Sequence, residues 1–232
     1  MFPLSSENEQ TAKSIVEKLK IERRERSNKL PVLSFRRLYS ILNGDEKLFV
    51  KNLLNQNPKT YGFNGPFLGI EKVPLFLKKI QGQKYTRERE EEEIAQQYLP
   101  FQVWLAYKKL SKAMKNEIGK EILIESGYRS PAYQVLTFLY SLVEKHKLDY
   151  EKTLNLVALP GYSQHGHPPL QAIDFTTKDG ALRGEKMGFE NTSEYDWLSK
   201  SANKYHFHLS YPKNNALGIR FEPWHWHYQK QN

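Results

Sequence analysis

The stretch GYSQHGHPPLQAIDF, residues 161–175, decides how this chain is understood. It combines imidazole and carboxylate groups, which are suitable zinc donors, in a loop that leads into an apolar strand. The aspartate of AIDF stands between two apolar residues, so in a strand it points away from the face that buries them. The stretch predicts either a metal-ligating loop or only a polar loop before an edge strand. The candidate residues are Ser163, His165, His167 and Asp174.

The C-terminal run FEPWHWHY, residues 221–228, contains a second set of candidates. Glu222 and His225 are three positions apart, and a continuous strand would send them to opposite faces. Pro223 suits the first position of a turn or short helix, where residues three apart share a side. That geometry would place a carboxylate beside a metal-binding imidazole. The alternative is an aromatic core formed by Trp224, Trp226 and Tyr228, with the histidines at its polar edge.

A third candidate lies in SGYRSPAYQ, residues 126–134. Arg129 follows a predicted strand and a glycine turn, a position from which its guanidinium can reach a pocket. The planar guanidinium suits carboxylates and developing oxyanions. An arginine after a strand is also common as an ordinary surface residue, so Arg129 counts only together with the other two stretches.

Composition limits the chemistry. The 232 residues are 39% hydrophobic and 13% aromatic, which is enough for a packed core. Cysteine is absent, which excludes disulfides, thiol nucleophiles and cysteine-based zinc sites. The net charge of +9 suits a polyanionic partner, either nucleic acid or an anionic cell envelope. Basic clusters such as residues 20–26, KIERRER, contain interleaved glutamates and no recognition motif, so we expect no nucleic-acid partner.

The chain shows no targeting or membrane signal. No apolar stretch is long enough to span a bilayer, so we expect no transmembrane segment. The N-terminal MFPLSSENEQ lacks a basic region followed by an apolar core, so no signal peptide is visible.

Hydrophobic periodicity predicts a mixture of helices and a few short strands. Without regular strand–helix–strand alternation, this mixture favours the α+β class. Residues 1–97 look mainly helical, with a turn-rich segment at 60–69 and an exposed helix start or linker at 87–94. Predicted helices are 8–28, 33–42, 46–54, 103–118 and 131–144; predicted strands are 121–128, 170–177, 207–211 and 219–221.

The three motif stretches, in this order, resemble the zinc D-alanyl-D-alanine carboxypeptidase family, whose members include vancomycin-resistance carboxypeptidases. That family's pattern is Ser-Gly-Tyr-Arg-Ser with a Gln five residues after the Arg, then Pro-Gly-x-Ser-x-His with a downstream Asp, then Glu-x-Trp-His-x-x-Tyr. This chain has SGYRSPAYQ, PGYSQH…AIDF and EPWHWHY. The resemblance covers roughly residues 98–230, and three motifs in order are far more specific than one.

The chain departs from the family pattern in two places. Eight residues separate His165 from Asp174, where six are usual, and His206 stands where glycine is usual. His167 has the six-residue spacing, but residues 160–165 fit the start of the motif without a gap. A loop insertion is easily tolerated. His165 is therefore the expected ligand and His167 the alternative.

The resemblance implies a small antiparallel sheet that carries a mononuclear zinc site, is flanked by helices, and follows a mainly helical extension over residues 1–97. The catalytic domain would be residues 98–232. His165, Asp174 and His225 would hold Zn²⁺, with Glu222 as general base on a zinc-bound water and Arg129 at the oxyanion. Gln134 and Ser163 resemble positions that bind the terminal D-alanine. No catalytic role is expected for His206, His208 or His227.

The implied activity is a zinc D,D-carboxypeptidase, a hydrolase that removes the terminal D-alanine from peptidoglycan stem peptides. The inferred location is the periplasm or cell envelope. The alternatives are an L,D-carboxypeptidase or endopeptidase on the same peptides, and a zinc-bearing peptidoglycan-binding module without activity. A binding module has less need of a general base, so the presence of both Glu222 and Arg129 favours an enzyme.

Overall fold

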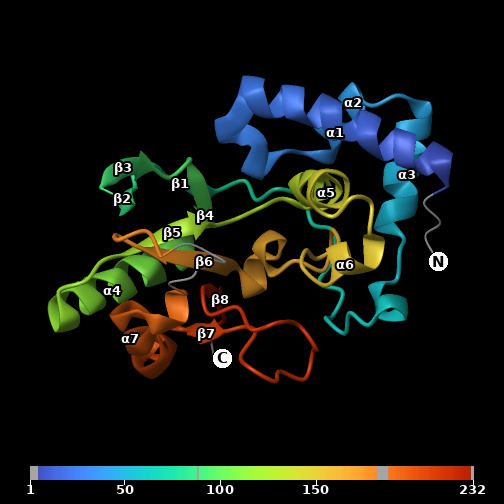
Figure 1. Cartoon of the computed structure of the whole chain (residues 1–232). Helices are drawn as coiled ribbons and strands as arrows, with labels where there is room; N and C mark the ends of the chain where they lie inside the picture. Colours follow the sequence, from blue (N-terminus) through green and yellow to red (C-terminus); the bar gives the residue numbers. More distant parts are fainter. Residues whose placement is uncertain (1–4, 88, 182–187, 231–232) are drawn as a thin grey trace. The chain divides into compact units, whose positions relative to one another are not determined.

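The computed structural model describes residues 5–87, 89–181 and 188–230 (Figure 1). Two compact units are present, and each is assembled from segments that are distant in sequence. The first comprises residues 1–73, 129–166 and 214–220, and the second residues 74–128, 167–213 and 221–232. The sequence prediction instead divides the chain once, into residues 1–97 and a catalytic domain of residues 98–232. That catalytic domain stays a prediction.

The first unit is helical. Its core is formed by one face of α1 together with side chains of α3 and α5, including Ile15, Leu19, Leu53 and Phe138, all fully buried. The predicted helices at 8–28, 33–42, 46–54 and 131–144 are confirmed, with ends shifted by a few residues. The helices are α1 (Ser6–Arg26), α2 (Phe35–Ile41), α3 (Gly44–Leu54), α5 (Pro131–Tyr140) and α6 (Tyr150–Leu154); η1 (Ser27–Val32), η2 (Pro58–Tyr61), η3 (Ser141–Lys145) and η4 (Gln164–Gly166) are short helical turns.

Two carboxylates are buried in this helical unit with cationic partners. Glu46 closes a capping box at the start of α3, since its side chain accepts from the Asn43 N–H and the Asn43 side chain accepts from the Glu46 N–H. The Glu46 carboxylate also accepts from Ser14 Oγ at 2.7 Å and Lys18 Nζ at 2.6 Å. Glu22 accepts two hydrogen bonds from the Arg37 guanidinium, at 3.0 and 2.7 Å.

The second unit contains a four-stranded antiparallel sheet in the order β5-β6-β8-β7. Its core joins the apolar side chains of the sheet to those of α4 and α7, including Leu110, Phe175 and Phe207. Together with the helical first unit, this confirms the α+β class and the small antiparallel sheet flanked by helices. The elements are β5 (Ile122–Ser126), β6 (Ala172–Thr177), β7 (Phe207–Leu209), β8 (His225–Tyr228), α4 (Phe101–Ile118) and α7 (Ser193–Ser201), with short turns η5 (Pro168–Leu170), η6 (Phe189–Asn191) and η7 (Ala202–Tyr205).

Two further sheets of two strands each precede α4, and they correct the prediction for residues 87–94. Residues 90–93 are a strand, not a helix start or a linker, because the all-glutamate run pairs with a basic and aromatic strand. Lys84 Nζ lies 2.6 Å from the Glu91 carboxylate, and Tyr85 donates to Glu92 at 2.7 Å. The strands are β1 (Leu77–Ile80) paired with β4 (Gln97–Pro100), and β2 (Lys84–Arg87) paired with β3 (Glu90–Glu93).

The predicted strand at residues 219–221 is wrong. This segment belongs to a turn-containing loop, because the Ile219 carbonyl accepts from the Asn215 side-chain amide at 2.6 Å instead of pairing with a strand. Asn215 also accepts from the Gly218 N–H through its backbone carbonyl. Among the described residues, no helix combines the length and the apolar character needed to cross a bilayer.

Candidate metal centre

Asp174 and His225 face one another across two neighbouring strands. The antiparallel register of β6 and β8 places Asp174 directly opposite His225, and directly opposite residues have their Cβ atoms about 5 Å apart. Asp174 Oδ1 and His225 Nδ1 are 2.8 Å apart. Asp174 is fully buried and His225 is 6% exposed, so the sheet holds both donors in fixed positions away from solvent.

A turn before β8 places Glu222 beside His225. The His225 N–H donates to the Glu222 carbonyl at 3.0 Å, which closes a turn over Pro223 and Trp224. The Glu222 carboxylate then lies 3.9 Å from His225 Nδ1, and its side chain is 14% exposed. Glu222 and His225 therefore share a side, as the proline predicted, while β8 itself begins only at His225.

The Tyr211 ring fixes the orientation of the His225 imidazole. The two rings stack with centroids 4.9 Å apart and planes inclined by 29°. The Tyr211 carbonyl also accepts from the Glu222 N–H at 3.1 Å, so one residue supports both the imidazole and the turn that carries the carboxylate. The sequence prediction missed Tyr211, because its contact with His225 depends on the packing of two segments that no local pattern specifies.

His165 lies in the short turn η4, on the loop that leads into β6. The loop is tied to the segment after β5, because the Arg129 N–H donates to the His165 carbonyl at 3.0 Å. Gly166 is required at this approach, since a Cβ there would lie 2.9 Å from the Arg129 carbonyl oxygen. The His165 side chain is 1% exposed.

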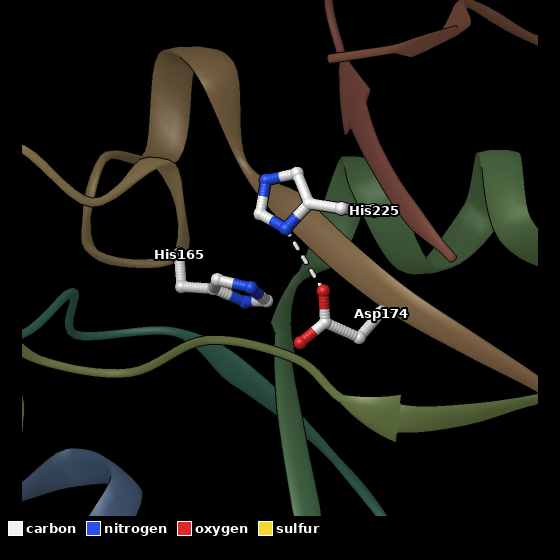
Figure 2. Close-up of side chains that lie close together, drawn as sticks. All are labelled: His165, Asp174 and His225. Atoms are coloured by element: carbon white, nitrogen blue, oxygen red, sulfur yellow. Dashed lines mark hydrogen bonds and ion pairs between the residues drawn. The ribbon is translucent and has the colours of Figure 1, made fainter. Parts of the chain in front are cut away.

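His165, Asp174 and His225 form a group of possible metal donors. One ligand atom from each lies within 4.8 Å of the others, and all three side chains are buried. Figure 2 shows the two imidazole rings turned toward the Asp174 carboxylate. Tetrahedral zinc, with bonds of about 2.0–2.2 Å, needs its donor atoms roughly 3.3 Å apart. The 2.8 Å separation of Oδ1 and Nδ1 is close to this, so two imidazoles and one carboxylate fit a zinc site.

The group contains His165 and not His167. His167, the alternative ligand, is half-buried and directly precedes η5. Its carbonyl accepts from the Leu170 N–H. The insertion of two residues between His165 and β6, in the segment with the prolines, stays a prediction.

The remaining predicted site residues lie outside the three-residue group. Arg129 and Ser163 are half-buried, while Gln134 on α5 is 2% exposed. The Gln134 Nε2 donates to the Ala158 carbonyl at 2.7 Å, and its Oε1 is buried with no hydrogen bond in the described chain. Gln134 thus supports the loop that precedes His165 and leaves one buried acceptor.

The other histidines of the sheet have distinct surroundings. His208 and His227 are cross-strand partners with ring centroids 5.7 Å apart. Burial, together with the nearby His208 and His225, lowers the pKa of His227 to about 4. His227 is therefore neutral at pH 7. His206 lies at the end of η7 in a left-handed conformation, with φ of 66°.

Known proteins resemble this chain over the part that contains the group of possible metal donors. A model of the family described as D-alanyl-D-alanine carboxypeptidase (VanY) matches residues 96–231, which is more than half of the chain and includes all three donors. YodJ of Bacillus subtilis strain 168, which is named as a carboxypeptidase, is 31% identical over 140 residues. That match covers 60% of this chain and 49% of YodJ, so the chain spans about half the length of this relative.

Two further relatives carry more specific names. VanXYC of Enterococcus gallinarum, a bifunctional D-Ala-D-Ala dipeptidase and D-Ala-D-Ala carboxypeptidase, is 32% identical over 138 residues. The match covers 56% of this chain and 67% of the length of VanXYC. The solved structure of the LdcB LD-carboxypeptidase, described with its peptidoglycan recognition, superposes with a TM-score of 0.53. The two chains are 30% identical in sequence, and the superposition covers 67% of this chain and 68% of the LdcB chain.

Proposed function

Because the chain belongs to the D-alanyl-D-alanine carboxypeptidase family, we propose that it is a zinc metallopeptidase that removes the terminal D-alanine from peptidoglycan stem peptides. The observation that carries the proposal is the buried group of His165, Asp174 and His225. An activity on stem peptides would place the protein at the periplasm or cell envelope.

The three buried donors would hold the zinc ion. Two neutral imidazoles and one carboxylate give a donor set of net charge −1, and catalytic zinc sites commonly use three protein ligands. When bound, zinc would supply Lewis-acid chemistry by polarising the scissile carbonyl and making water more acidic. The sheet supports the donors, since β6 and β8 hold Asp174 and His225 in register and the Tyr211 ring packs on His225.

Glu222 would be the general base. Its carboxylate is 3.9 Å from a ligand nitrogen but outside the three-residue group, so it can take part in proton transfer without being a ligand. Glu222 would accept a proton from the attacking water and deliver it to the amine that leaves when the amide bond breaks. Such a positioned base contributes about 10²–10⁴ in rate.

Three other residues would bind the substrate. Arg129 would stabilise the oxyanion or hold the peptide near the scissile bond, because a guanidinium offers a planar set of donors. Ser163 and Gln134 would bind the terminal D-alanine. Support for these roles comes from the matched motifs and from the backbone bond that joins Arg129 to His165.

A second candidate function is L,D-carboxypeptidase activity, which is favoured by the similarity to LdcB. The two activities differ in the bond that is cut. A D,D-carboxypeptidase shortens a pentapeptide stem that ends in D-Ala-D-Ala, whereas an L,D-carboxypeptidase shortens a tetrapeptide stem. Endopeptidase cleavage of cross-links, or binding without cleavage, are the remaining alternatives.

Mass spectrometry of muropeptides separates these candidates. The zinc-loaded protein is incubated with pentapeptide, tetrapeptide and cross-linked muropeptides, with a chelated sample as control. We expect the pentapeptide to lose one D-alanine in the zinc-loaded sample only. Loss from tetrapeptide alone would establish the L,D-activity instead. If every muropeptide is intact after extended incubation, the enzymatic proposal is wrong and a binding module remains.

A further inference from the structure

A second polar site lies at the other end of β8 from the metal-binding group. A cavity of about 510 Å³ opens between α4, η7 and the end of β8, all within the second unit. We call it the lysine pocket. Its polar and aromatic walls are Lys109, Lys204, Lys230, Tyr205, His206 and Tyr228. None of the metal donors lines it, and Tyr228 is three residues along the strand from His225, about 10 Å away.

The rim of the lysine pocket carries three positive charges without compensation. Lys109, Lys204 and Lys230 are exposed, and none forms an ion pair within residues 5–87, 89–181 and 188–230. The described lining contains no aspartate or glutamate. Ammonium groups gathered around a concave surface raise the local potential and favour an anion.

The inner wall is aromatic and rigidly supported. The His206 and Tyr228 rings meet edge to face, with centroids 5.9 Å apart and planes at 85°. Tyr205 stacks on Trp197 at 6.1 Å. These residues offer flat apolar surfaces with polar edges, and Gln102 on α4 adds an amide to the lining. A ligand with an anionic group and a short polyol or ring body would meet a complementary surface.

His206, which forms part of this wall, has a strained backbone conformation. Its φ of 66° lies in the left-handed region, which residues with a Cβ rarely adopt. The His206 N–H donates to the Asn203 carbonyl, and its own carbonyl accepts from the Gln229 N–H at 2.9 Å. Glycine would satisfy the same backbone bonds without strain. Strained conformations cluster at binding and catalytic sites, and here the imidazole lines the lysine pocket.

We propose that the lysine pocket binds a phosphate-bearing anion of the phosphodiester class. Three ammonium groups match a multiply charged or repeating anion better than a single carboxylate, and lysine acts as a point charge suited to phosphate oxygens. The site is separate from the metal centre, so it would anchor the protein on an anionic polymer or headgroup surface instead of taking part in hydrolysis. The net charge of +9 favours the same class of partner.

Calorimetric titration of the zinc-loaded full chain tests this assignment. The probes are inorganic phosphate, a glycerol phosphate oligomer, acetate at equal ionic strength, and vesicles containing an anionic phospholipid. We expect saturable binding of the oligomer, weaker binding of phosphate and none of acetate. Binding to the oligomer identifies a soluble phosphodiester as the source, whereas binding to vesicles alone identifies a lipid headgroup.

Matched variants separate the pocket from overall charge. The double variant Lys204→Gln/Lys230→Gln should weaken binding at least tenfold. The control Lys79→Gln/Lys112→Gln removes the same charge from exposed positions outside the lining and should change the affinity less than twofold. An equal loss of affinity in both double variants would show that binding depends only on net charge, and it would overturn the proposal.

The variant His206→Gly distinguishes a binding role from a structural one. Because glycine relieves the left-handed strain, the melting temperature should stay the same or rise, while oligomer affinity falls about threefold or more. Unchanged affinity would remove His206 from the site. Absence of saturable binding for every phosphate probe, or acetate binding as tight as that of the oligomer, would refute a phosphate site in the wild-type protein.

Discussion

Glu46 and Asp174 are both buried carboxylates, but they are surrounded by different chemistry. Glu46 is 2% exposed, and its partners are a lysine ammonium, a serine hydroxyl and a backbone N–H. Asp174 is fully buried beside two imidazoles that lie within the same donor group. The first carboxylate has a cation supplied by the chain, whereas the second lies beside imidazoles of the kind that a metal ion uses as ligands.

This difference supports a structural role for Glu46 and the proposed metal-binding role for Asp174. A buried carboxylate with its own cationic partner and full hydrogen bonding contributes to folding. Removing it leaves the buried donors around it without an acceptor, which destabilises the protein. A buried carboxylate grouped with imidazole donors gains further stabilisation when a metal ion binds, because metal binding is coupled to folding. Substitutions at the two positions should therefore affect different measurements, stability at Glu46 and metal retention at Asp174.

The largest effect is expected from Asp174→Asn. Removing the charged donor should abolish stoichiometric zinc binding and lower D-alanine release by roughly 10³-fold or more, since a catalytic metal supplies several kcal/mol. Mass spectrometry for bound metal and an assay of released D-alanine measure both. The free energy of unfolding of the metal-free protein should change by less than about 1 kcal/mol, because asparagine can still pair with His225. Asp179→Asn, at an exposed carboxylate, is the control and should keep both metal and activity.

A smaller and more selective effect is expected from Glu222→Gln. This variant should retain zinc, because Glu222 lies outside the donor group, while kcat falls about 10²–10⁴-fold through loss of the base. Metal content and kinetics are measured on the same preparation. Loss of zinc together with activity would make Glu222 a ligand, and unchanged kcat would exclude it from proton transfer.

The corresponding test in the helical unit is Glu46→Gln. The neutral amide cannot accept from Lys18, Ser14 and Asn43 as the carboxylate does, so the free energy of unfolding should fall by about 2 kcal/mol, as for hydrogen bonds to charged groups. Urea denaturation followed by circular dichroism measures the change. Zinc content should remain unchanged. Glu25→Gln, at an exposed position of α1, should shift stability by less than about 0.5 kcal/mol.

The helices were predictable from the sequence because local patterns specify them. In α1, the apolar Ile15, Val16 and Leu19 recur at helical spacing and are all buried. The strands were harder, since β3 consists of four glutamates that no β propensity favours. Its pairing depends on Lys84 and Tyr85 in the opposite strand, which is information outside the segment itself.

The candidate site was predictable only as separate pieces. The spacing of Glu222, Pro223 and His225 indicated the turn, because proline restricts the local backbone. The register that sets Asp174 opposite His225 joins strands 51 residues apart, and no local pattern fixes such a pairing. The three donors could be grouped from the sequence only through the resemblance to a family, and Tyr211 was missed because its role depends on packing.

The smallest effect is the pH dependence of the Glu46 contribution. Burial raises the pKa of Glu46, but the Lys18 ammonium, the Asn43 N–H and the Ser14 hydroxyl outweigh it and hold the pKa below its ordinary value of 4.5. A lowered pKa in the folded state contributes stability above pH 4.5, and that stability is lost as pH falls through the folded-state pKa. The difference in unfolding free energy between the wild type and Glu46→Gln should therefore be full at pH 7 and decline below pH 4.5. Urea titrations of both proteins at pH 7 and pH 3 test this. A difference that persists undiminished at pH 3 would mean that Glu46 acts through packing and not through its charge, and the contrast with Asp174 would then rest on metal binding alone.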